Sequence, residues 1–149
     1  MDAVLASLVA VTGTLVAAFG GFVVQVHISR RDQVRKTAAQ FAHRLSVHRG
    51  QLYRRWEIAR QENPDPQEQR AAGDMSDTTR GDITLALYEL RVLTRNTRLL
   101  RLAEEAVDAT YAVKRRGEDL AAVTEADIDA RRKRGLAADT AFLTAAAAL

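Results

Sequence analysis

The fold is decided by the stretch 34–52, VRKTAAQFAHRLSVHRGQL. Along it, uncharged or weakly polar positions recur in alternating steps of four and three residues, which is the heptad spacing of a helix that packs against other helices. His48 falls on this pattern and is interpreted as a polar insert in the packing interface. The apolar positions form a predicted helical seam that consists of Val34, Ala38, Phe41, Leu45 and Leu52.

Toward the N-terminus, the run 3–28 contains no charged residue. As a helix that rises about 1.5 Å per residue it would be roughly 39 Å long, more than the ~30 Å thickness of a bilayer's hydrocarbon core. We therefore expect a transmembrane helix over residues 1–29. A signal peptide and a buried core helix are the alternatives, and the opening Met1-Asp2 lacks the positive charge that begins a signal peptide.

Small residues recur four apart within this run, at Gly13, Ala17 and Gly21. Such spacing lets two helix backbones approach closely in a membrane. It predicts a transmembrane packing face, although a lipid-facing helix of ordinary Gly and Ala content gives the same pattern.

Basic residues crowd the far end of the run. By the positive-inside rule they predict a single-pass protein of the inner (plasma) membrane, with its N-terminus outside and its C-terminal body in the cytoplasm. They are also candidates for binding anionic lipid headgroups, the alternative being a solvated helix face that only signals topology. These candidates are Arg30, Arg31, Arg35 and Lys36.

The remaining chain divides by its helix-breaking residues. The stretch 30–62 is a basic helix that ends before Asn63-Pro64-Asp65-Pro66, and the polar stretch 63–81 is a predicted linker. Thr79-Arg80-Gly81-Asp82 resembles a capping box that begins a helical part, 82–149, expected to pack on the basic helix.

Within residues 82–149, cap residues predict where helices begin and end. A turn near Arg95-Asn96-Thr97 separates two apolar stripes on different faces, with one unbroken helix as the alternative. Lys114-Arg115-Arg116-Gly117 is typical of a helix C-terminus, and Thr124-Glu125-Ala126-Asp127 of a helix N-terminus. Arg131-Arg132-Lys133-Arg134 spreads around its helix, which favours a solvated face.

Composition supports the same class. The 149 residues suit one domain, the absence of Cys excludes disulfides and thiolate chemistry, and two Pro with 5% aromatic residues favour helices. The prediction is an all-α protein: an N-terminal transmembrane helix that continues into a long juxtamembrane helix, followed by a small antiparallel helical bundle.

No catalytic or cofactor motif is present. Phosphate loops, zinc motifs and nucleophile elbows are missing, and His43 and His48, five residues apart, do not share a helix face. We expect no enzyme activity, no catalytic or metal-binding residue and no cofactor.

In outline, residues 1–62 and 82–113 resemble bacterial, especially actinobacterial, single-pass membrane proteins with an Arg-rich juxtamembrane helix and a helical cytoplasmic body. The resemblance is carried by the Arg-rich exit of the apolar run, by the segment ALYELRVL at 86–93 and by the stretch 99–113. It implies an architecture and carries over no catalytic residue.

These observations predict a membrane-anchored helical interaction or scaffold module at the cytoplasmic face. It would self-associate or hold another membrane or cytoplasmic protein, next to anionic lipids. The alternative is a membrane-perturbing or pore-forming effector of the phage lysis or defence type. Nucleic acid is not expected as a partner, although Arg54 and Arg55 lie next to Tyr53 and Trp56, which could stack on bases.

Overall fold

The computed structural model describes the backbone of residues 2–149 and the side chains of residues 29–149. Its elements are α1 (Asp2–Ala59), α2 (Pro66–Leu93), α3 (Thr97–Tyr111), the short 3-10 helix η1 (Leu120–Ala122) and α4 (Glu125–Ala147). Because these elements are all helical and the described residues contain no strand, the prediction of an all-α chain is confirmed.

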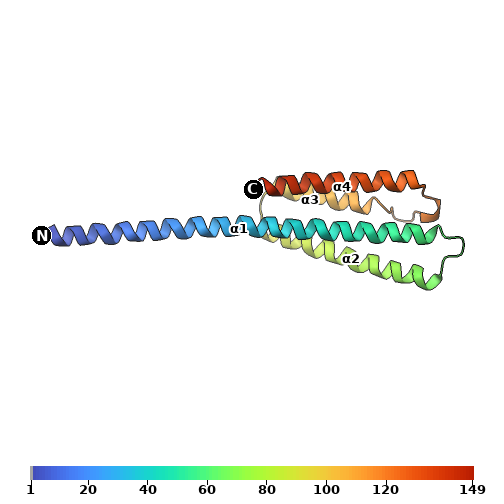
Figure 1. Cartoon of the computed structure of the whole chain (residues 1–149), viewed down its shortest axis with the longest axis horizontal. Coiled ribbons are helices and arrows are strands. Elements are labelled where there is room, and N and C mark those ends of the chain that lie inside the picture. The colour runs from blue at the N-terminus through green and yellow to red at the C-terminus, as the bar shows by residue number, and fades with distance from the viewer. Residues whose placement is uncertain (1) are drawn as a thin grey trace. The chain divides into compact units, whose positions relative to one another are not determined.

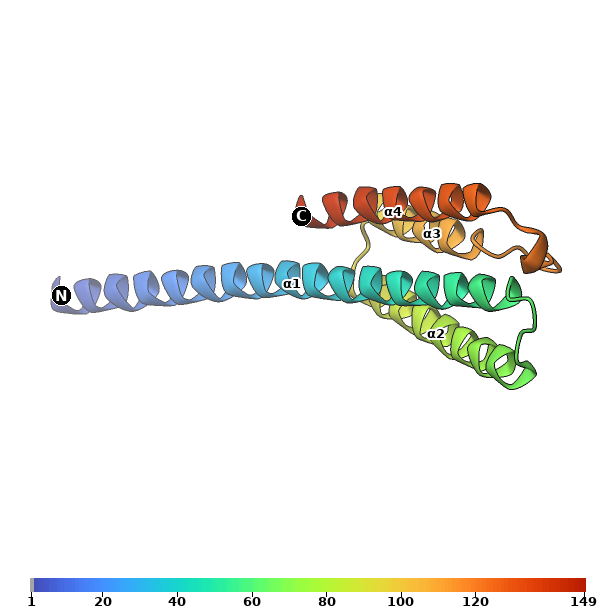
Figure 2. The same ribbon diagram turned by 45° about the vertical axis from the view of Figure 1, so that its right-hand side comes forward.

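The chain divides into two compact units, Met1–Gln33 and Val34–Leu149. The first unit is the N-terminal part of α1. The second contains the rest of α1 together with α2, α3 and α4, whose chain direction alternates from one helix to the next (Figure 1). Seen from a second direction, the four helices of this unit again run side by side (Figure 2). We call this second unit the bundle.

The predicted inner-membrane localisation is contradicted. Within the part of the chain whose side chains are described, no helix combines the length and the apolar character needed to cross a bilayer. The predicted packing residues Gly13, Ala17 and Gly21 lie outside these residues.

The main core of the bundle consists of apolar side chains from all four α-helices. Phe41 on α1 and Phe142 on α4 are fully buried, and their rings meet edge to face with centroids 5.3 Å apart. Ile83 and Leu90 of α2 and Leu99 of α3 join the same cluster. Since burying one such side chain contributes about 1.5–3 kcal/mol, this cluster is the principal source of the bundle's stability.

A second, smaller core closes the end of the bundle where α1 ends. Trp56 packs there with Val113, Leu120 and Ile128, and its indole Nε1 donates a hydrogen bond of 2.9 Å to the carbonyl oxygen of Val123. The indole therefore has its polar group satisfied inside the core. This cluster attaches the segment between α3 and α4 to α1.

Two of the predicted helix boundaries are confirmed. Asn96 caps α3, its side chain accepting a hydrogen bond from the backbone N–H of Leu99, so the stretch 82–116 contains a break and not one continuous helix. Thr124 caps α4 by accepting from the backbone N–H of Asp127. Both side chains satisfy backbone donors that the first turn leaves without partners.

The predicted linker 63–81 is wrong over most of its length, because α2 already begins at Pro66. Asp65 caps it and Pro66 takes the first helical position, where a proline costs no hydrogen bond. The capping box expected at Thr79-Arg80-Gly81-Asp82 is therefore the interior of a helix. Its buried face is made of small and hydroxyl-bearing residues that hydrophobic periodicity does not reveal, namely Ala72, Ser76 and Thr79.

A buried ion pair joins three helices of the bundle. The guanidinium of Arg49 on α1 pairs with the carboxylate of Asp139 on α4, with exposed side-chain fractions of 5% and 11%. Its Nη1 also donates to Thr110 Oγ1 on α3 at 2.8 Å. Arg49 is not one of the predicted seam residues, yet the bundle encloses it.

Gly135 provides the space for this guanidinium. A Cβ atom at position 135 would lie 2.9 Å from Cδ of Arg49, whose end is fixed by Asp139 and Thr110. We expect Gly135→Ala to lower the free energy of unfolding by about 1–2 kcal/mol, because the overpacking outweighs the roughly 1 kcal/mol that Ala gains over Gly in a helix.

The matched control for this prediction is Gly73→Ala. Gly73 lies inside α2, and a Cβ atom added there would meet no neighbouring atom within 4 Å. The substitution should therefore stabilise the chain by roughly 1 kcal/mol. Urea unfolding of both variants measures whether each substitution raises or lowers the free energy of unfolding. A stabilising Gly135→Ala would contradict the packing argument.

Candidate functional site

One end of the bundle holds a cavity of about 620 Å³ whose lining is strongly basic. Three separate segments supply the lining: the end of α1, the first half of α2, and the end of α3 with the loop that follows it. Five of its residues are Lys or Arg and one is acidic. We call it the basic cavity, and its lining is His48, Leu52, Arg55, Ser76, Asp77, Arg80, Tyr111, Lys114, Arg115, Arg116 and Gly117.

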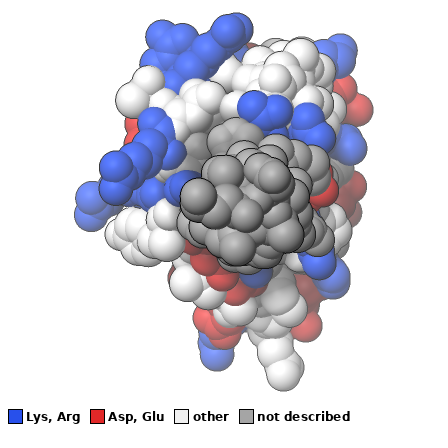
Figure 3. Space-filling model, turned by 90° about the vertical axis from the view of Figure 1, so that its left-hand side faces the viewer, with Lys and Arg blue, Asp and Glu red and all other residues white. Residues whose placement is uncertain are grey.

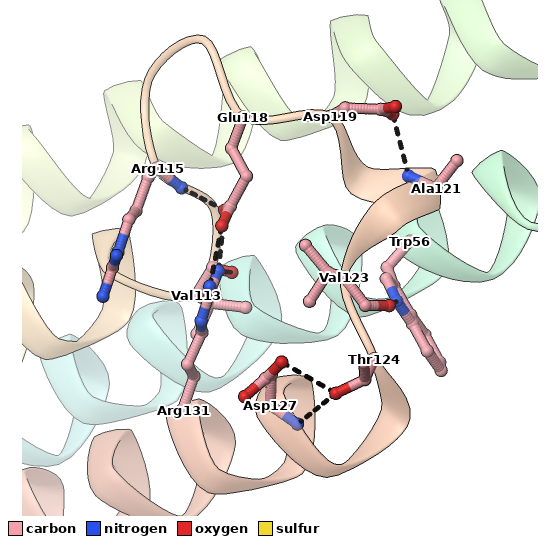
Figure 4. Close-up of polar contacts among 10 residues, drawn as sticks. All are labelled: Trp56, Val113, Arg115, Glu118, Asp119, Ala121, Val123, Thr124, Asp127 and Arg131. Atoms are coloured by element: carbon pink, nitrogen blue, oxygen red, sulfur yellow. Dashed lines mark hydrogen bonds and ion pairs between the residues drawn. The ribbon is translucent and has the colours of Figure 1, made fainter.

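The loop that carries three of these cations is held in one conformation. Glu118 accepts two hydrogen bonds from the guanidinium of Arg131 on α4, at 2.6 and 2.7 Å, and a third from the backbone N–H of Arg115 at 3.0 Å (Figure 4). The hydrogen bond from Arg131 is the main reason that the pKa of Glu118 falls to about 2. Gly117, with φ 75°, makes the turn in a region that other residues rarely adopt.

His48 lies at the buried side of the cavity, only 3% exposed. Its Nδ1 is 2.7 Å from Thr79 Oγ1, which itself donates to the carbonyl oxygen of Ser76 at 3.0 Å. Because a hydroxyl has one proton, the assignment that satisfies both contacts has His48 donating from Nδ1. Burial, followed by repulsion from Arg80 and Arg55, lowers the pKa of His48 to about 4, so the ring is neutral near pH 7.

The positive charge of the cavity is not neutralised from within. None of its five Lys and Arg side chains forms an ion pair in the part of the chain whose side chains the structure describes. The guanidinium of Arg80 lies over the Tyr111 ring, 5.0 Å from its centroid, and the ring of His48 meets the same Tyr111 ring edge to face. The cavity thus combines fixed cations with aromatic surface.

A second surface of interest is the outer side of α2. Leu85, Tyr88 and Val92 are 55%, 56% and 83% exposed, and their spacing of three and four residues places them on one face of the helix. The same spacing continues backward through the exposed residues Gly81, Thr78 and Asp74. We call this row of six residues the outer face of α2.

The predicted site residues whose side chains the structure describes lie in two different settings. Val34, Ala38, Phe41, Leu45 and Leu52, the predicted seam, are buried inside the bundle. The four predicted headgroup ligands have exposed side chains, and Arg35 donates to the carbonyl oxygen of Ala147 at 3.2 Å. At the end of the molecule that faces the viewer in Figure 3, Lys and Arg gather in several groups with Asp and Glu among them.

Sequence reasoning misses the basic cavity. It interprets Lys114-Arg115-Arg116-Gly117 as a helix C-terminus and Arg131 as part of a solvated face, whereas Arg131 is largely buried against Glu118. The available signal is the recurrence of basic residues near positions 55, 80 and 115. Nothing in the sequence shows that these positions converge.

The fold and these surfaces define the class of protein, which is a four-helix bundle with a basic cavity and an exposed apolar helix face. The chain belongs to the KilB plasmid transfer protein family, whose family model matches residues 35–149, which is almost the whole bundle. No curated protein and no solved structure matches the chain.

Proposed function

We propose that this chain is a helical interaction module of plasmid transfer that self-associates, two copies pairing through the outer face of α2. The observation that carries the proposal is the row of exposed apolar side chains Leu85, Tyr88 and Val92 at heptad spacing. Exposed heptad rows of this kind are the usual surface on which one helix binds another. The family supports the setting, because its members are plasmid transfer proteins.

Charge complementarity favours a second copy of the chain, in antiparallel orientation, as the partner that binds the outer face of α2. Asp74 lies roughly 16 Å along the helix before Leu85, and Arg95 follows the other end of α2, after the extended residue Thr94. An antiparallel pair centred on Leu85 brings Asp74 of each copy to the end of α2 of the other copy, where Arg95 follows the helix. A parallel pair would instead place like charges together at both ends.

The same antiparallel arrangement also fits by size. It sets Gly81 of one copy level with Tyr88 of the other, within one residue. Gly81 has open space around the position that a Cβ would occupy, so it leaves room for the tyrosine ring. The row therefore matches itself when reversed, as an isologous interface requires.

Leu85→Glu is expected to weaken self-association of the purified full chain by at least about tenfold, or ~1.4 kcal/mol, since it puts a carboxylate at the centre of the interface. Sedimentation velocity over a concentration series measures the effect. Leu136→Glu is the matched control, because Leu136 is a comparably exposed leucine, 49%, on α4. Plasmid transfer frequency should fall with Leu85→Glu and not with Leu136→Glu.

A charge exchange tests the orientation in the same assay. Asp74→Arg alone should weaken the pair, and adding Arg95→Asp should restore it, because the exchanged charges again face each other. A wild-type chain that stays monomeric at every concentration would refute the proposal, as would equal losses for the two leucine variants.

A further inference from the structure

We propose that the basic cavity binds a phosphate-bearing ligand of the nucleotide class, either a free nucleotide or the phosphorylated end of a nucleic-acid strand. This goes beyond the proposed self-association, which uses a different surface of α2. Both ligands carry a phosphate ester on a sugar that bears a flat purine or pyrimidine ring.

The charge of the lining points to an anion. Arg55, Arg80, Lys114, Arg115 and Arg116 reach the cavity from three segments, and Asp77 is its one acidic residue. A guanidinium group can donate two parallel hydrogen bonds to a phosphate, and arginine is therefore a preferred side chain for phosphate binding. Five cations held together without ion-pair partners repel one another, and a phosphate group would relieve that repulsion.

The size and the remaining lining point to a nucleotide. A volume of about 620 Å³ falls in the range of about 300–1,000 Å³ typical of small-molecule sites. Of the remaining lining, Tyr111 is partly exposed and supplies aromatic surface next to the cations, whereas Leu52 and His48 are almost fully buried. An inorganic anion would leave that surface uncovered, whereas a purine or pyrimidine ring would cover it.

The contacts that shape the site are formed without a ligand. The bidentate Glu118–Arg131 ion pair fixes the loop that carries Lys114, Arg115 and Arg116. Tyr111 is held between the ring of His48 and the guanidinium of Arg80. A preformed site loses less conformational entropy on binding than a mobile basic tail would.

Isothermal titration calorimetry of the full chain with ADP, a 5′-phosphorylated deoxyadenosine tetranucleotide and adenosine tests the proposal at low salt. We expect ADP or the tetranucleotide to bind and adenosine to bind at least about tenfold more weakly, because it lacks the phosphate. Binding of ADP identifies the free nucleotide as a source, and binding of the tetranucleotide alone identifies the strand end.

The location is tested by two charge-matched double variants. Arg115→Ala with Arg116→Ala should weaken binding at least about tenfold, whereas Lys133→Ala with Arg134→Ala removes the same charge from the exposed side of α4 and should change it less than about twofold. Circular dichroism melting checks that both variants fold.

An NMR titration of His48 gives a readout that does not depend on any variant. The groups that face this ring are Arg55 on α1, Asp77 and Arg80 on α2 and Tyr111 on α3. A bound phosphate should offset the repulsion from the two arginines and raise the pKa of His48. The proposal fails if neither phosphorylated probe binds, if adenosine binds equally well, or if both double variants lose binding equally.

Discussion

Replacing Asp139 by alanine is expected to lower the free energy of unfolding by about 3–5 kcal/mol, the largest effect that we expect from a single substitution in this chain. The change leaves the guanidinium of Arg49 buried, 5% exposed, with Thr110 as its remaining partner. A buried charge without a counter-charge pays its desolvation cost uncompensated. Urea or thermal unfolding, followed by circular dichroism, measures the loss.

Two controls distinguish the cost of leaving a buried charge unpaired from the cost of losing an ion pair as such. Glu105→Ala removes the exposed pair of Arg101 with Glu105, whose side chains are 69% and 55% exposed, and should cost under about 1 kcal/mol. Arg49→Met combined with Asp139→Leu removes both buried charges and should recover most of the stability lost in Asp139→Ala. A loss below about 1 kcal/mol in Asp139→Ala would mean that water reaches the pair.

Acidification is expected to destabilise the bundle through His48, by on the order of 3 kcal/mol between pH 6.5 and pH 4. Burial and the two neighbouring arginines lower the pKa of His48 from 6.5 to about 4 in the folded chain. In this window the unfolded chain therefore binds a proton that the folded chain does not. The stabilisation is complete above pH 6.5 and is lost as the pH falls toward 4.

The variant His48→Gln isolates this contribution, because glutamine can still hydrogen-bond to Thr79 and does not titrate. Its free energy of unfolding should fall less steeply than that of the wild type from pH 6.5 to 4.5. Glu118, with a pKa lowered to about 2, contributes stability that is lost only from about pH 4.5 downward, which separates the two groups. Equal slopes for wild type and variant above pH 4.5 would contradict the assignment.

The helical character of the bundle is predictable because it depends on local chemistry. The heptad spacing of stretch 34–52 marks residues that do lie in the core, and Asn96 and Thr124 begin helices where their cap chemistry predicts. The start of α2 escapes prediction because its buried face, Ala72, Ser76 and Thr79, is too polar to give an apolar period.

The predicted inner-membrane localisation, which the structure contradicts, depends on a different stretch of the sequence. The prediction of an inner-membrane protein rests on the apolar character of the uncharged run 3–28 alone. Within the residues whose side chains are described, however, no helix is suited to cross a membrane. The charged exposed sides of these helices belong to a bundle that buries its apolar faces against itself.

The sequence by itself determined the helical class, the caps at Asn96 and Thr124 and the seam residues that enter the core, because each follows from contacts within a few turns of one helix. Only the tertiary structure decided that Arg49 lies inside the bundle and that basic residues near 55, 80 and 115 line one cavity. Those facts arise where segments far apart along the chain pack together, and local periodicity carries no information about which segments meet.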